Sequence, residues 1–129
     1  MVSKTNIHRL GELQLRIMKV LWAKGDVTVA DVHAALTSER DLAYTTVATM
    51  LRRLEERGLV RHRVEGRTFL YQAAVAEVDV SRSMADHLLD RLFKGSMADM
   101  VRHLLSTREV SKKELSALER LIAEHKKSK

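Results

Sequence analysis

The sequence contains no cysteine and no proline, and only five of its 129 residues are glycine. The lack of cysteine excludes disulfide bonds, thiolate nucleophiles, iron–sulfur clusters and zinc sites built from cysteine. The lack of proline, against an average usage of about 5%, favours long uninterrupted helices because proline breaks a helix interior.

Long apolar runs are missing as well. No run approaches the roughly 20 residues that a membrane-spanning helix needs. The N-terminal residues 1–6 are not followed by the apolar segment of a secretory signal. We therefore expect a cytoplasmic protein without membrane insertion.

Positive charge exceeds negative charge, since 23 lysine and arginine residues against 17 aspartate and glutamate residues give a net charge of +6. Such an excess is compatible with a polyanionic partner. The segment from Arg40 to Thr68 holds seven arginines and no lysine, and the planar guanidinium suits phosphates and guanine edges better than an ammonium does. An isolated charge run is more often a solvated helix face, so the position of these arginines in the fold decides between the two interpretations.

The hydrophobic pattern predicts three helices in the first part of the chain. Apolar residues recur at helical spacing between Gly11 and Gly25, and again after Thr28, which suits a helix N-cap. A third helix is predicted from Tyr44 to Arg57, with Gly58 ending it.

A β-hairpin is predicted next. Residues 59–64 and 67–72 alternate between polar and apolar side chains, with Glu65-Gly66 as a two-residue turn. Three helices followed by a hairpin are typical of a winged helix-turn-helix. The expected fold is therefore mainly α with a small β-hairpin wing, divided into a winged-helix DNA-binding domain in residues 1–75 and a C-terminal helical dimerisation region in residues 76–129.

The third helix is predicted to bury one face and to present the other to the DNA major groove, which is about 12 Å wide. Its core side is expected to hold Val47, Met50, Leu51 and Leu54. Threonine methyl groups can pack on thymine methyl groups, whereas arginines near the helix end and beside the hairpin tip suit phosphates. The residues predicted to contact DNA are Tyr44, Thr45, Thr46, Thr49, Arg52, Arg53, Arg63 and Arg67.

The C-terminal region is predicted to pair two copies of the chain. Helical patterns run from Asp79 to Phe93, then after the break at Gly95-Ser96, and again after a capping box at Ser111 and Glu114. About 50 residues bury too little surface to hold a core alone, so pairing with a second copy is favoured over packing within one chain. The predicted dimer contacts are Met84, Leu88, Leu92, Met97, Met100, Val101, Leu104, Leu115, Leu118 and Ile122.

The segment from Leu42 to Leu54, LAYTTVATMLRRL, followed by Gly58-Leu59-Val60, resembles the BlaI/MecI family of penicillinase and methicillin-resistance repressors. Leu10-Gly11-Glu12-Leu13 and the pair Gly66-Arg67 with Tyr71 are similar to that family too. The resemblance implies a homodimeric repressor of transcription that binds a dyad-symmetric operator in double-stranded DNA. It also implies a membrane receptor-protease system as a partner.

In that family, a receptor-linked signal leads to proteolysis within the C-terminal helices, which separates the dimer from its DNA-binding heads. Alignment on Phe93-Lys94-Gly95 and on Ser111 places the cleaved bond near His103-Leu104. The family's repressors of known penicillinase systems have Asn-Phe there, and this sequence departs from that pair. The resemblance therefore implies a signal-dependent event in the C-terminal region, with this bond as the candidate.

Two other interpretations stay open. A metal-sensing winged-helix repressor of the ArsR type would use residues such as His87, Asp90 and His103, whereas the copper-responsive CopY mode is excluded because its ligands are cysteines. A winged-helix module for protein contacts would have an apolar or acidic outer face on the third helix, against which Thr45 and Thr49 argue. No cofactor, metal or catalytic residue is predicted, because the sequence has no GxSxG, GxGxxG, P-loop or HExxH motif.

Overall fold

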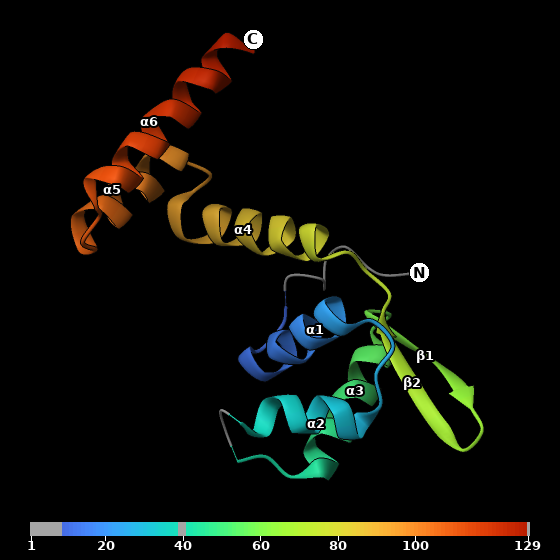
Figure 1. The fold of residues 1–129 in the computed structure, drawn as a ribbon. Coiled ribbons are helices and arrows are strands. Elements are labelled where there is room, and N and C mark those ends of the chain that lie inside the picture. Colours follow the sequence, from blue (N-terminus) through green and yellow to red (C-terminus); the bar gives the residue numbers. More distant parts are fainter. Residues whose placement is uncertain (1–8, 39–40, 129) are drawn as a thin grey trace. The chain divides into compact units, whose positions relative to one another are not determined.

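The computed structural model describes residues 9–38 and 41–128, and within them the chain forms six helices and one two-stranded antiparallel sheet (Figure 1). Arg40, which the sequence groups with the other arginines, lies outside the described residues. The elements are α1 (Glu12–Lys24), α2 (Val29–Thr37), α3 (Tyr44–Glu56), β1 (Val60–Glu65), β2 (Thr68–Ala73), α4 (Glu77–Phe93), α5 (Met97–Thr107) and α6 (Lys112–Lys127).

The chain divides between His87 and Leu88 into two compact units. The first unit holds α1 to α3, the hairpin of β1 and β2, and the first part of α4. The second holds the end of α4 with α5 and α6. None of the helices in the two described stretches has both the length and the apolar character that crossing a membrane needs.

The helix starts follow from local side-chain chemistry. Thr28 caps α2, because its hydroxyl accepts a hydrogen bond from the backbone N–H of Asp31 and its own N–H donates to the Asp31 carboxylate, each over 3.0 Å. Hydrogen bonding to the carboxylate, from the backbone N–H of Thr28 first and from the Thr28 side chain second, lowers the pKa of Asp31. The N-cap predicted at Thr28 is therefore confirmed.

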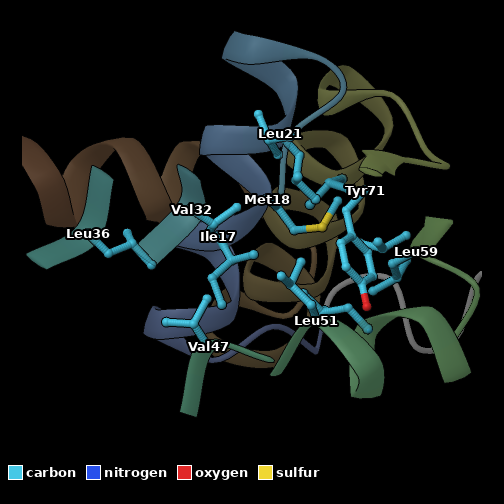
Figure 2. Close-up of a cluster of buried hydrophobic side chains, with 13 residues drawn as sticks. Ile17, Met18, Leu21, Val32, Leu36, Val47, Leu51, Leu59 and Tyr71 are labelled. Atoms are coloured by element: carbon cyan, nitrogen blue, oxygen red, sulfur yellow. The ribbon is translucent and has the colours of Figure 1, made fainter. Parts of the chain in front are cut away.

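The core of the first unit lies where α1, α2 and α3 meet the base of the hairpin (Figure 2). Of the four core positions predicted on α3, Val47, Leu51 and Leu54 are fully buried, whereas Met50 is partly buried at the edge. The remaining core side chains come from every element of the unit and the loops between them, and are Ile17, Met18, Leu21, Val27, Val32, Leu36, Leu59, Val60, Tyr71 and Val80.

The hairpin turn differs by one residue from the prediction. Glu65 pairs with Thr68 as the last rung of the ladder, so that Gly66-Arg67, and not Glu65-Gly66, forms the turn. Gly66 has a φ of +65°, and a glycine at the first central position is the requirement of a type II′ hairpin turn. Arg67 therefore lies at the tip of the wing.

Two contacts fix the base of the wing to the helices. The backbone of Val27 pairs with Tyr71 through two hydrogen bonds of 3.0 and 2.7 Å, which adds a one-residue bridge beside β2. The indole Nε1 of Trp22 donates to the carbonyl oxygen of Val75 over 2.9 Å. The strand that leaves the wing is therefore held against α1 and the α1–α2 loop.

α4 begins inside the first unit. Val80 is buried in the core, and Met84 is partly buried and packs against it. The helical region predicted from residue 76 onward therefore includes a segment that packs on the winged-helix core. The predicted domain boundary after residue 75 lies just before α4, and the two compact units divide further along that helix, after His87.

In the second unit, serine hydroxyls cap the N-termini of both α5 and α6. Ser96 accepts from the N–H of Asp99 and Ser111 accepts from the N–H of Glu114, each over 3.1 Å. The helix starts predicted after Gly95-Ser96 and at Ser111 are thus confirmed. No side chain of α5 or α6 is fully buried among the described residues of these helices.

Candidate DNA-binding surface

α3 has its polar side chains on the face opposite the core. Because Val47, Leu51 and Leu54 point into the core, Thr45 and Arg52 remain exposed on the other side of the helix. The other predicted contacts of this helix divide into two groups: Tyr44 and Arg53 are exposed, and Thr46 and Thr49 are half-buried. The helix therefore has one apolar face in the core and one polar face open to solvent, as a recognition helix requires.

A groove of about 560 Å³ lies between α3 and the wing. The helix contributes Thr45, Thr49, Arg52 and Glu55 to its wall, and the hairpin contributes His62, Phe69 and Tyr71. Three of the predicted contacts, Thr45, Thr49 and Arg52, are thus brought together, whereas Arg53 and Thr46 lie outside this groove.

A second groove, of about 500 Å³, lies between the N-terminus of α2, the start of α3 and the tip of the wing. Tyr44 and Arg67 both line it, together with Thr28 and Thr68. Phe69 borders both grooves. The predicted contacts at the start of α3 and at the wing tip therefore share one surface.

Arg63 is placed differently from Arg67. Its guanidinium donates to Glu65 over 2.6 Å and to Asp26 over 3.1 Å. These hydrogen bonds raise the pKa of Arg63, the bond to Glu65 first. Arg63 therefore links the wing to the α1–α2 loop, whereas no ion pair of Arg67 is found within residues 9–38 and 41–128.

Glu55, His62 and Phe69 also line the first groove but are not among the residues predicted from the sequence to contact DNA. The signals for them were present in part. Glu55 follows Arg52 by three positions on a helix, so the two share a face. His62 and Phe69 occupy positions of one hairpin face, because strand side chains alternate and His62 pairs with Tyr71 across the ladder. The sequence does not show how close the hairpin lies to α3, so it could not predict that these side chains share one groove.

In the second unit, most of the predicted dimer contacts are exposed apolar side chains. Met100 and Leu118 are half-buried, and Met84 belongs to the first unit. α5 and α6 also enclose a small groove of about 200 Å³ lined by Val101, Leu104 and Leu118. The predicted contacts that are exposed are Leu88, Leu92, Met97, Val101, Leu104, Leu115 and Ile122.

The predicted cleavage position lies within α5. The carbonyl oxygen of His103 accepts hydrogen bonds from Ser106 Oγ over 2.9 Å and from Thr107 Oγ1 over 2.8 Å. The ring of His103 lies 5.7 Å from that of Phe93, measured between centroids. The bond between His103 and Leu104 is therefore part of a regular helix.

The described residues contain no group of three or more histidine, cysteine, aspartate or glutamate side chains arranged to hold a metal ion.

The family model described as penicillinase repressor matches residues 10–124 of the chain. The penicillinase repressor of Bacillus licheniformis is 29% identical over 95% of this chain and 96% of its own length. The transcriptional regulator BlaI of Mycobacterium tuberculosis is 36% identical over 90% of this chain and 84% of its own length.

Solved structures show the same fold. The solution structure of the DNA-binding domain of the repressor BlaI is 30% identical and has a TM-score of 0.53, covering 61% of this chain and 93% of that domain. The structure of an S. aureus MepR mutant bound to an oligodeoxyribonucleotide is 18% identical with a TM-score of 0.54, covering 97% of this chain and 83% of MepR, and shows the fold alone. The chain belongs to the penicillinase repressor family and is a winged-helix DNA-binding repressor of transcription.

Proposed function

We propose that this repressor binds a dyad-symmetric operator as a homodimer, with α3 in the major groove and the wing beside it. The observation that carries the proposal is the groove between α3 and the wing, where Thr45, Thr49 and Arg52 are brought to one surface. A helix with this exposed polar face fits a major groove about 12 Å wide. The twofold axis of the dimer would match the symmetry of the operator.

Each predicted contact has a distinct role in this proposal. Thr45 and Thr49 read base edges, because their hydroxyls and methyl groups suit thymine and neighbouring acceptors. Arg52 and Arg53, near the end of α3, bind phosphates and set the position of the helix. Tyr44 and Thr46, at the start of the helix, extend the contact surface.

The two wing arginines are proposed to differ. Arg67, at the turn, reaches a phosphate or the minor groove directly. Arg63 is engaged by Asp26 and Glu65, so binding a phosphate would require it to leave these carboxylates. We therefore assign direct contact at the wing mainly to Arg67.

Dimerisation is assigned to the C-terminal helices. Leu92, Met97 and Ile122, all in the second unit, expose more than half of their surface, and covering such apolar side chains favours association. We propose that the partner is a second copy of the chain. Both α5 and α6 present apolar side chains, and none of the described side chains of these two helices is fully buried.

We further propose that derepression acts through this pairing. Two linked heads bind an operator far more tightly than one head does, so an event that separates the C-terminal helices releases the DNA. By analogy with the family, we propose that this event is cleavage of the chain near His103-Leu104, triggered by a membrane receptor-protease system. The repressor would then act in the cytoplasm, where its operator lies.

Binding to DNA duplexes selected from random sequence by the wild-type protein tests the proposal. Fluorescence anisotropy should give a higher affinity for duplexes with two inverted half-sites than for those with one. Sedimentation equilibrium should give a dimer at the same concentrations. A monomer, or equal affinity for one and two half-sites, would contradict the proposal.

A further inference from the structure

A hydrogen-bonded contact joins the wing to α3 beside the predicted DNA-contacting residues. The Nδ1 atom of His62 on β1 lies 2.7 Å from each carboxylate oxygen of Glu55 on α3. Both side chains are mostly covered, with 26% and 32% of their surface exposed. These two side chains are therefore better shielded from water than those of the ion pairs that Arg16, Lys19, Arg63, Arg82 and Arg102 form with carboxylates, which are 38% to 75% exposed.

The His62 ring is held from its other side by the wing's own aromatic residues. Its centroid lies 4.3 Å from that of Phe69 with an interplanar angle of 15°, which is a stacked arrangement. Tyr71 lies 5.4 Å away in a tilted arrangement. The ring is thus restrained by β2 while it bonds to α3, so the hairpin and the helix cannot move apart without breaking this contact.

Glu55 itself is out of place on a DNA-binding surface. It lines the same groove as Thr45, Thr49 and Arg52, where a carboxylate repels DNA phosphates. Its charge also contributes to raising the pKa of Tyr71, after the larger effect of burial. Glu55 would repel DNA, yet it is hydrogen-bonded to His62. A role in holding the wing against α3 explains why a carboxylate is present at this position.

We propose that Glu55 and His62 are positioning residues that fix the wing against α3 before DNA binds. With the contact made, Arg67 at the wing tip and Arg52 on α3 are presented to the same duplex at a fixed separation. The other charged or titratable groups that face the contact are Arg52 on α3 and Tyr71 on β2. The proposal rests on the placement of α3 and the wing on DNA given above.

The substitution Glu55→Ala distinguishes a positioning role from simple charge repulsion, because the two predict changes in DNA affinity of opposite sign. Removal of a negative charge from the DNA-facing surface should strengthen binding, whereas release of the wing should weaken it. We expect Glu55→Ala to lower the affinity for the selected operator duplex about fivefold, at a salt concentration near physiological. Glu56→Ala is the matched control, because Glu56 is the next residue of α3, carries the same charge and lies outside the groove.

Conservative variants test the interaction between the two side chains. Glu55→Gln retains an acceptor for the His62 Nδ1–H and should recover most of the affinity that Glu55→Ala removes. The double variant Glu55→Ala with His62→Ala should be no weaker than the weaker single variant, since either substitution alone already breaks the interaction. Thermal unfolding of each variant checks that it folds.

Hydrogen exchange of the β1 and β2 amides in the DNA-free protein gives a readout that does not depend on DNA. Glu55→Ala and His62→Ala should each increase exchange in the hairpin, and Glu56→Ala should not. Stronger DNA binding by Glu55→Ala, or unchanged hairpin exchange, would overturn the positioning role. If instead Arg52→Ala with Arg53→Ala left DNA binding intact, the proposed DNA surface would fail, and the exchange data would still decide the role of Glu55 and His62.

Discussion

Arg63 on β1 and Asp26 in the α1–α2 loop are joined by a hydrogen-bonded ion pair of 3.1 Å between Nη2 and Oδ2. The same guanidinium donates to Glu65 near the tip of the wing. Together with the His62–Glu55 contact, this pair ties the hairpin to α3 on one face and to the α1–α2 loop on the other, because Arg63 and His62 point to opposite sides of the strand.

The engagement of Arg63 predicts a difference between the two wing arginines. Arg67→Ala should lower DNA affinity and reduce the slope of log affinity against log salt concentration by about one for each phosphate that the arginine neutralises. Arg63→Ala should change that slope less, because its guanidinium already has two carboxylate partners. Anisotropy titrations at several salt concentrations give both slopes. Equal slope changes would mean that Arg63 leaves its partners for the DNA.

The paired arginines at the end of α3 should act on all sequences alike. Replacing Arg52 and Arg53 by Ala is expected to weaken binding to operator and to unrelated duplexes by similar factors, because phosphate contacts carry no sequence information. The measurement is the affinity for both classes of DNA across a salt series. A variant that loses operator affinity alone would show that one of these arginines reads a base.

The threonines should behave in the opposite way. Thr45→Ala or Thr49→Ala is expected to cost about 1–3 kcal/mol of binding free energy at particular base pairs, since each removes a hydroxyl and a methyl group from a base-reading position. Affinities for single-base operator variants locate those pairs. Uniform loss across all the operator variants would indicate that the threonines do not read sequence.

Charge placed on the apolar side of α6 should disrupt the dimer. Leu118→Asp with Ile122→Asp puts two carboxylates one helical turn apart on the predicted contact face. We expect a larger monomer fraction in sedimentation and a parallel loss of operator affinity. Arg120→Asp serves as the control, because residue 120 is exposed and lies on the other side of the same helix. If the double variant remains a stable dimer, the dimer interface does not include this face of α6.

The cap of α2 should make stability depend on acidity. Two hydrogen bonds from Thr28 lower the pKa of Asp31 in the folded chain. A depressed carboxyl pKa stabilises the folded state above the unfolded-state pKa, and this stabilisation is lost as pH falls through the folded-state pKa. Asp31→Asn should therefore lower the thermal midpoint at neutral pH, and the difference from wild type should shrink as the solution is made acidic enough to protonate Asp31. A constant difference would exclude this linkage.

The local elements could be predicted because their signals lie close together in the sequence. α3 was expected from Tyr44 to Arg57 and runs from Tyr44 to Glu56, since its apolar positions and Gly58 mark both the face and the end. The turn at Gly66 was displaced by one position, because sequence alternation does not distinguish a glycine at the first central position from one at the second.

The contacts that set the wing could not be predicted in the same way. Arg63 and Asp26 are 37 residues apart, and they meet only because Val27 pairs with Tyr71 and brings the loop to the hairpin. Glu55 and His62 are close in sequence, but their contact depends on the angle between a helix and a strand on either side of Gly58. Side-chain chemistry alone indicates that such residues are polar, and tertiary geometry decides whether they face DNA or one another.

The absence of fully buried side chains from the described parts of α5 and α6 has a consequence for how abundance affects this repressor. If these helices complete their packing only against another molecule, their stability includes the free energy of association and rises with the amount of protein present. A lower protein concentration would then destabilise the C-terminal helices and reduce operator occupancy at the same time. The cellular copy number would therefore set both the lifetime of the repressor and the level of repression.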